Sequence, residues 1–175
     1  MALSEGLENK VRKAFRFFDL DKDGILTREE MINIAHKISA LSNATKEEAE
    51  VTRREWTKWC DFLFPEGQIT EDDYIERGKK MFDKDGAKIK AEDYTCYNNV
   101  FERLDSNKDG FISPEELRMY YKAFGYGEDY DIDKVFQSLD SNKDGMISRE
   151  EFVKATVDYW TTDSGYEFFY DVPRK

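Results

Sequence analysis

The sequence predicts an all-α fold: four helix-loop-helix units, arranged as two packed pairs in one compact globule, with short antiparallel β contacts between the paired loops. Three observations lead to this prediction. An acidic segment of twelve residues occurs three times, apolar residues flank each copy at helical spacing, and a shortened fourth unit lies between the first copy and the second. A repeat of this kind indicates one supersecondary unit that is used several times.

The three acidic segments share one pattern of residue types. Asp or Asn occupies positions 1, 3 and 5, glycine occupies position 6, a branched aliphatic residue occupies position 8 and glutamate occupies position 12. Glycine at position 6 permits a sharp bend that a Cβ atom would obstruct. This is the pattern of the EF-hand calcium loop. The three segments are Asp19–Glu30, Asp105–Glu116 and Asp140–Glu151.

Apolar residues with i, i+3, i+4, i+7 spacing precede and follow each segment, which predicts an amphipathic helix on either side of it. The entering helices carry Val11, Ala14, Phe15 and Phe18, then Tyr97, Val100, Phe101 and Leu104, then Ile132, Val135, Phe136 and Leu139. The exiting helices carry Met31, Ile34, Ala35 and Ile38, then Leu117, Tyr120, Tyr121 and Phe124, then Phe152, Ala155, Thr156 and Tyr159.

A second unit is expected between residues 45 and 85, because loops of this type occur in pairs that meet at position 8. Thr45 and Glu48 have the capping-box spacing that predicts a helix start. The apolar spacing beyond them gives a loop of ten residues, 64–73, two short of a calcium loop, with Phe64 in place of the first carboxylate. We expect this unit to pair Ile69 with Leu26 and to bind no metal.

The four units divide the chain into two predicted domains. Residues 1–85 form the N-terminal pair, of which the first hand binds calcium, and residues 86–175 form the C-terminal pair, of which both hands bind calcium, together with an aromatic C-terminal tail. The stretch from Asp83 to Gly86 resembles a loop start, but its register places Lys88 at position 8 and Met81 at position 1. We therefore interpret residues 83–90 as a connector without metal.

Calcium is a hard cation that takes about six to eight oxygen ligands, and each full loop offers such a set. We expect side chains to bind from positions 1, 3 and 5, a backbone carbonyl from position 7, and both carboxylate oxygens from position 12, with position 9 acting beside or through a water. Magnesium is the expected competitor. The predicted ligands are Asp19, Asp21, Asp23, Ile25, Thr27 and Glu30; Asp105, Asn107, Asp109, Phe111, Ser113 and Glu116; and Asp140, Asn142, Asp144, Met146, Ser148 and Glu151.

Composition excludes several functions. The formal net charge of −11 disfavours binding to nucleic acid or to an anionic membrane surface. No apolar run approaches the roughly 20 residues that span a bilayer. Ala2 stands where myristoylation needs glycine, so we expect no stable membrane anchor. Two cysteines, Cys60 and Cys96, do not make a disulfide framework, and a cytoplasmic monomer is expected.

No catalytic constellation is recognisable, and we expect the protein not to be an enzyme. The only histidine, His36, has no identifiable catalytic partner. Cys60 falls on an apolar helix face and is expected to pack in the core. The tail Gly165–Pro173 is rich in aromatic residues, and we expect it to close over the protein's own apolar cleft, with capping of a ligand cavity or displacement by a target as the alternatives.

Four hands, a metal-free second hand and an aromatic C-terminal segment together resemble the sarcoplasmic calcium-binding proteins. The similarity extends to calexcitin-like proteins, bacterial calerythrin, and the coelenterazine-binding proteins and photoproteins. The resemblance covers nearly the whole chain and implies a globule whose two halves pack together. Photoproteins carry several histidines around their chromophore, and this chain has one, His36, so it departs from that pattern.

Three functions are compatible with the sequence. The first is a cytosolic calcium buffer or transporter that holds three calcium ions. The second is a calcium sensor or signalling regulator that engages an amphipathic helix of a target protein, although the five methionines are scattered rather than gathered in a groove. The third is a carrier that releases a small luciferin-like molecule when calcium binds.

Overall fold

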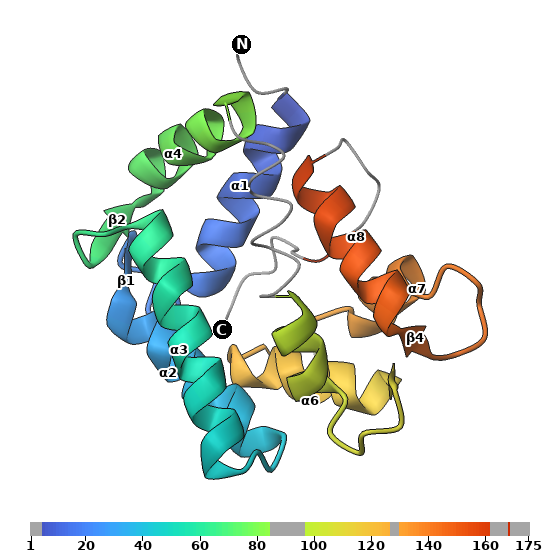
Figure 1. Ribbon diagram of the computed structural model, residues 1–175. Helices are drawn as coiled ribbons and strands as arrows, with labels where there is room; N and C mark the ends of the chain where they lie inside the picture. The colour runs from blue at the N-terminus through green and yellow to red at the C-terminus, as the bar shows by residue number, and fades with distance from the viewer. Residues whose placement is uncertain (1–4, 85–96, 127–129, 162–167, 169–175) are drawn as a thin grey trace.

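The computed structural model describes residues 5–84, 97–126, 130–161 and Phe168. These residues are mainly helical, with two short antiparallel sheets, which confirms the predicted all-α class (Figure 1). The N-terminal half contains α1 (Glu5–Phe18), β1 (Ile25–Thr27), α2 (Arg28–Leu41), α3 (Lys46–Leu63), β2 (Gln68–Thr70) and α4 (Glu71–Lys84). The C-terminal half contains a helical stretch over 97–104, then β3 (Phe111–Ile112), α6 (Pro114–Ala123), α7 (Ile132–Leu139), β4 (Ile147–Ser148) and α8 (Arg149–Thr161).

Each sheet joins the loops of one pair at position 8. Strand β1 pairs with β2, and Leu26 lies opposite Ile69, as the sequence predicts. Strand β3 pairs with β4, and Ile112 lies opposite Ile147. All four of these side chains are buried, so each sheet carries its two loops on the surface of a shared apolar core.

The exiting helices begin at capping boxes that include loop residues. The hydroxyl of Thr27, at position 9 of the first loop, accepts the backbone N–H of Glu30, and the Glu30 carboxylate accepts the N–H of Thr27. Ser113 and Glu116 form the same box at the start of α6. The box predicted for Thr45 is present at the start of α3. The position-12 glutamate therefore fixes the helix start as well as belonging to the loop.

The second hand has the shortened loop that the sequence predicts. Phe64 follows α3, and its N–H bonds to the carbonyl of Cys60 at 2.7 Å, just as the N–H of Asp19 bonds to Phe15 at 2.9 Å after α1. The ring of Phe64 is 1% exposed, so an apolar side chain fills the position of the first carboxylate. At the other end, Thr70 donates its hydroxyl hydrogen to Asp73, which marks Asp73 as position 12.

The connector between the two halves is described only in part. Helix α4 continues through Asp83 and Lys84, so the start of the predicted connector is helical. The remainder of residues 83–90, and the predicted domain boundary after residue 85, lie outside the described residues.

Helix α4 packs closely along α1 (Figure 1). Gly78 makes this approach possible, because a Cβ atom there would lie 3.2 Å from a methyl carbon of Val11. The N-terminal end of α4 is also tied to α1 by ion pairs from Glu71 to Arg16 at 2.9 Å and to Arg12 at 3.4 Å. Acidic residues in the first turn of a helix are favourable on their own account, so Glu71 stabilises both the helix and its contact.

Phe17 joins the N-terminal pair to the C-terminal pair. Its ring is 1% exposed and stacks on Tyr126 with 4.7 Å between centroids. Phe124 lies 4.4 Å away, and Tyr121 meets the ring edge-on at 5.6 Å. The apolar spacing of the sequence places Phe18 rather than Phe17 on the buried face. The structure uses both, because Phe17 packs against the opposite half while Phe18 faces a cavity between the halves.

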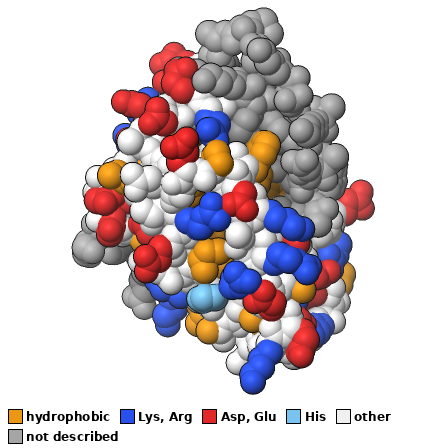
Figure 2. Space-filling model, turned by 60° about the vertical axis from the view of Figure 1, so that its left-hand side comes forward, with side chains coloured by type: hydrophobic (Ala, Val, Ile, Leu, Met, Phe, Trp, Pro, Cys, Tyr) orange, Lys and Arg blue, Asp and Glu red, His pale blue; other side chains and the backbone are white. Residues whose placement is uncertain are grey.

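Charged contacts also bridge the halves. Glu48, in the first turn of α3, lies 3.0 Å from Lys108 of the third loop and 3.5 Å from Arg103. The Thr45 N–H and then the Lys108 ammonium lower the pKa of Glu48 to about 2. Figure 2 shows acidic and basic side chains interspersed over the face it presents. Among the described residues, no helix is long and apolar enough to cross a bilayer.

Candidate metal centres and an aromatic cavity

The first loop brings three carboxylates together after α1. Oxygen atoms of Asp19, Asp21 and Asp23 all lie within 4.8 Å of one another. Asp19 accepts the N–H groups of Lys22 at 2.9 Å and Gly24 at 3.1 Å. Gly24 has a φ of +83°, which a side chain would strain. The backbone therefore folds around Asp19 and gathers the three carboxylates on one side of the loop.

Glu30 completes this group with an oxygen that lacks a donor. Its Oε2 accepts hydrogen bonds from the N–H of Thr27 at 2.9 Å and from the Thr27 hydroxyl at 2.8 Å. Its Oε1 is buried and receives no hydrogen bond from any residue that the structure describes. A buried carboxylate oxygen without a partner is costly, and a cation would satisfy it. The donor set and this orphaned atom both fit a calcium ion.

The third and fourth loops repeat the fold of the first around their leading aspartates. Asp105 accepts N–H groups from Asp109 and Gly110, both at 3.0 Å. Asp140 accepts from Asp144 at 3.2 Å and from Gly145 at 3.0 Å. Asn replaces Asp at position 3 and binds position 5 through both amide atoms, at 2.8–2.9 Å in the two loops. These two loops therefore carry fewer mutually repelling charges than the first.

The position-12 glutamates of these two loops differ from Glu30, because a serine holds their second oxygen. Glu116 Oε1 accepts the Ser106 hydroxyl and the Ser106 N–H, both at 2.9 Å. Glu151 Oε1 accepts the Ser141 hydroxyl at 2.9 Å and the Ser141 N–H at 3.1 Å. In the first loop, position 2 is Leu20, which has no hydroxyl. An ion that binds Glu116 or Glu151 through both oxygens must compete with these serines.

The carboxyl pKa shifts reflect different environments at Asp19 and at the two serine-bonded glutamates. Burial raises the pKa of Asp19, against the N–H groups of Gly24 and Lys22, and the charges of Glu30 and Asp21 raise it further. Burial also opposes ionisation of Glu116, but hydrogen bonds from Ser113, Ser106 and Asn107 lower its pKa overall. The pKa of Glu151 is lowered by the equivalent bonds. The first loop thus holds crowded charge that a cation would relieve.

The contact of Ser106 with Glu116 was not predicted from the sequence, and it leads to a testable expectation. Ser106→Ala should raise the calcium affinity of the third loop about fivefold, because one hydrogen bond that competes with the ion, of net worth about 1 kcal/mol, is removed. Competition with a fluorescent chelator, in a Glu30→Gln/Glu151→Gln background that isolates this loop, measures the change. Ser138→Ala is the matched control, since the Ser138 hydroxyl bonds within α7 to Val135. An unchanged affinity would show that Ser106 does not compete.

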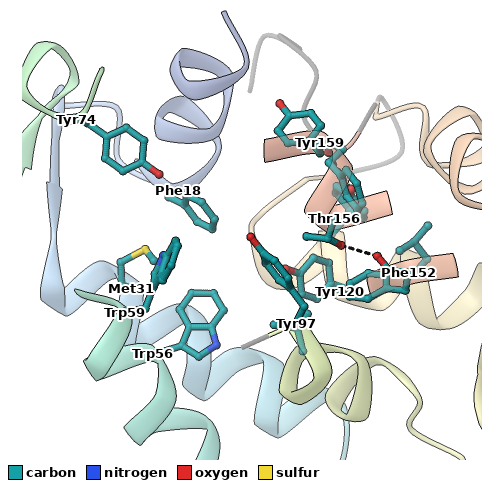
Figure 3. A pocket seen from close by; sticks show the side chains of 14 residues that line it. Phe18, Met31, Trp56, Trp59, Tyr74, Tyr97, Tyr120, Phe152, Thr156 and Tyr159 are labelled. Atoms are coloured by element: carbon teal, nitrogen blue, oxygen red, sulfur yellow. Dashed lines mark hydrogen bonds between the residues drawn. The ribbon is translucent and has the colours of Figure 1, made fainter. Parts of the chain in front are cut away.

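An aromatic cavity lies between the two halves of the molecule, apart from the loops. Its volume is about 80 Å³. The Thr156 hydroxyl, which belongs to the lining, donates to the carbonyl of Phe152 at 2.7 Å within α8. Figure 3 shows Phe18, Met31, Trp56, Trp59 and Tyr74 on one side and Tyr97, Tyr120, Phe152, Thr156 and Tyr159 on the other.

Phe168 of the aromatic tail closes part of this cavity. Its backbone carbonyl accepts hydrogen bonds from the hydroxyls of Tyr121 at 2.8 Å and Tyr130 at 3.0 Å. Its ring is 8% exposed and lies edge-on to Tyr159, 5.5 Å between centroids. The expectation that the tail closes over the apolar cleft therefore holds for Phe168. The rest of the Gly165–Pro173 segment lies outside the described residues.

Two further residues that the sequence brings to attention are Cys60 and His36. The environment of Cys60 suits packing in the core, and that of His36 suits contact with solvent. Cys60 is fully buried, and burial raises the pKa of its thiol to about 12, so the reactive thiolate is suppressed. His36 is exposed on α2. Cys96 lies outside the described residues.

Comparison with known proteins agrees with the loop geometry. The EF-hand domain pair profile matches residues 98–157, and an EF-hand domain profile matches residues 10–40. The sarcoplasmic calcium-binding protein of Mizuhopecten yessoensis is 28% identical over 69% of this chain and 69% of its own length. That of Hediste diversicolor is 30% identical over 66% of this chain and 68% of its own length.

The fold also matches solved structures. The calcium-loaded apo form of the coelenterazine-binding protein from Renilla muelleri superposes with a TM-score of 0.67 and 27% identity, covering 93% of both chains. The domain matches, the relatives and the superposition all agree with loops of the EF-hand calcium-binding type. The chain therefore belongs to the EF-hand family of calcium-binding proteins, and the sarcoplasmic calcium-binding proteins are among its homologues.

Proposed function

We propose that this protein is a calcium buffer that holds three calcium ions, one in each of the first, third and fourth hands. The observation that carries the proposal is the recurrence of one loop geometry, in which the leading aspartate accepts the N–H of the position-6 glycine and the position-12 glutamate accepts the N–H of position 9. The second hand, with Phe64 and a ten-residue loop, is proposed to be structural only.

The proposed ligands are the residues predicted from the sequence. They include the Asp side chains of the loops, Asn107 and Asn142, one backbone carbonyl per loop and the three glutamates. Calcium supplies six charges when three ions bind, so the formal net charge of −11 would fall to about −5. Magnesium, which prefers a tighter octahedral arrangement, is proposed as a resting-state competitor.

Closure of the apolar cleft supports a buffer rather than a sensor. A calcium sensor exposes a methionine-rich groove to its target. Here Phe168 closes part of the cleft and its carbonyl is held by Tyr121 and Tyr130, while Met31 is the one methionine among the described residues that line it. A monomeric, cytoplasmic protein without catalytic activity is part of the same proposal.

Calorimetric titration with calcium in millimolar magnesium tests the ion count, and dye binding tests the buffer role. We expect three ions per chain, and little change in the fluorescence of a hydrophobic dye between calcium and chelator. A count of two or four would contradict the three-site assignment. A large rise of dye fluorescence in calcium would overturn the buffer role in favour of a sensor.

The aromatic lining favours a second candidate, a carrier for an apolar aromatic molecule. The cavity volume of about 80 Å³ is well below the roughly 300 Å³ at which small-molecule sites begin, so such a ligand requires Phe168 to leave. Phe168→Ala should then raise the affinity for an added aromatic ligand, followed by its absorbance after desalting, while Phe62→Ala, which changes an exposed ring, should not. Equal retention by both variants would argue against the carrier.

A further inference from the structure

Arg77, on α4, reaches across the second hand to the end of α3. Its Nη1 donates to the carbonyl of Leu63 at 2.6 Å and to the carbonyl of Phe62 at 3.3 Å. Helix α3 ends at Leu63, so these two carbonyls belong to the last turn and have no donor from within the helix. The C-terminal end of a helix carries a partial negative charge, which favours a cation at this place.

The position of Arg77 in its hand is unusual. It lies four residues after position 12, on the exiting helix. The same position in the three calcium-type hands is occupied by Ile34, Tyr120 and Ala155, on the apolar face of the exiting helix. The second hand, whose loop is two residues too short for calcium, is the one that places an arginine there. The loss of the ion site and the presence of a side-chain cation therefore coincide in one hand.

A calcium ion in a full hand connects the entering helix to the exiting helix, because its ligands come from the start of the loop and from position 12. In the second hand, the Arg77 guanidinium makes that connection, from α4 to the end of α3. We propose that Arg77 is a built-in cation that keeps the second hand closed without calcium, and that it thereby positions the first loop for binding. The inference rests on the proposed calcium site in the first loop.

Three contacts carry the effect from the second hand to the first loop. Strand β2 pairs with β1, which is part of the first loop. The Arg28 N–H, at position 10, donates to the carbonyl of Gly67 at 2.9 Å. The Arg28 side chain forms an ion pair of 2.6 Å with Asp61, next to the end of α3 that Arg77 holds. The first loop is thus supported by a partner that needs no ion, whereas the third and fourth loops pair with each other.

The direction of the change in calcium affinity distinguishes positioning of the first loop by Arg77 from a simple electrostatic effect of its charge. Removing a positive charge near an acidic loop reduces the repulsion that a bound cation experiences. Electrostatics alone therefore predicts tighter calcium binding. Loss of Arg77 as a positioning residue should have the opposite sign and weaken calcium binding. A lower affinity after removal of the positive charge is therefore diagnostic.

The test uses the full chain with Glu116→Gln and Glu151→Gln, which leaves the first loop as the calcium site. In this background, Arg77→Met should weaken calcium binding about tenfold, since two hydrogen bonds between the helices are lost. Arg77→Lys, which keeps a donor and the charge, should retain most of the affinity. Arg53→Met is the matched control, because Arg53 pairs with Glu50 within α3 and should leave the affinity unchanged or slightly higher. An unchanged or tighter affinity in Arg77→Met would overturn the proposal.

Hydrogen exchange in the presence of chelator provides the second measurement. The backbone amides of the β1–β2 pair, Leu26 and Ile69 among them, should be protected in the parent protein and in Arg77→Lys, and should lose protection in Arg77→Met. Equal protection in all three proteins would refute the role of Arg77, whatever the first loop binds. If the background protein binds no calcium while Arg77→Met still loses protection, the first-loop site fails and the built-in cation stands.

Discussion

Replacing Glu116 by glutamine should lower the calcium bound at saturation from three ions per chain to two, and Glu30→Gln and Glu151→Gln should each do the same. Glutamine keeps the size of the side chain but removes its charge and one of the two equivalent oxygens that calcium requires. Each substitution should also remove the stabilisation that its ion provides, about 2.7 kcal/mol at a calcium concentration a hundredfold above the dissociation constant.

Equilibrium dialysis and chemical denaturation in calcium measure these two effects. The chain offers a matched control beside each ligand, because Glu29, Glu115 and Glu150 are exposed glutamates at position 11. Their replacement by glutamine makes the same charge change without touching a predicted ligand, and should leave three ions bound. Glutamine at position 12 still satisfies the capping box, so the exiting helix should remain intact in the variants. Three ions bound by Glu116→Gln would refute the assignment of that loop.

Phe17→Ala should destabilise the protein by about 3–5 kcal/mol, the range for a large aromatic residue removed from a packed core. The ring is 1% exposed and contacts three aromatic residues of the other half, so its removal leaves a void at the junction of the two pairs. The free energy of unfolding in saturating calcium measures the loss.

Phe62→Ala is the comparison for Phe17→Ala, since Phe62 is 38% exposed and should cost far less. A second signature is expected in the shape of the transition. If the aromatic contacts of Phe17 couple the halves, the variant should unfold with a broader transition or in two steps. A single sharp transition, with a loss no larger than that of Phe62→Ala, would show that other contacts hold the halves together.

The local rules of the sequence predicted the loops well. The repeat fixed the register of each calcium loop, and the apolar spacing on both sides of the second hand gave the ten-residue loop and the pairing of Leu26 with Ile69. These features depend on residues close together in the chain. The capping box at Thr45 belongs to the same class, because its two partners are three residues apart.

The features that the sequence analysis missed depend on contacts between distant segments. Phe17 precedes the expected apolar position, and only the packing of α1 against the C-terminal half explains its burial. Arg77 occupies an apolar position of its helix, and this misfit was the signal that could have revealed it. The serines at position 2 were visible in two loops, but their bond to position 12 appears only when the loop closes. The spacing of residue types along the chain does not show which distant residues come into contact.

The paired residues Thr70 and Asp73 separate two roles that the same loop positions combine in the other hands. They exchange hydrogen bonds at the start of α4, as the position-9 and position-12 residues do in the other hands, although their loop is two residues shorter than the other three. Starting a helix and coordinating a metal are therefore separable tasks of the same two positions. The same two positions can therefore begin a helix in a hand with a ten-residue loop and an aspartate in place of glutamate, and that hand still supplies the strand that pairs with the first loop.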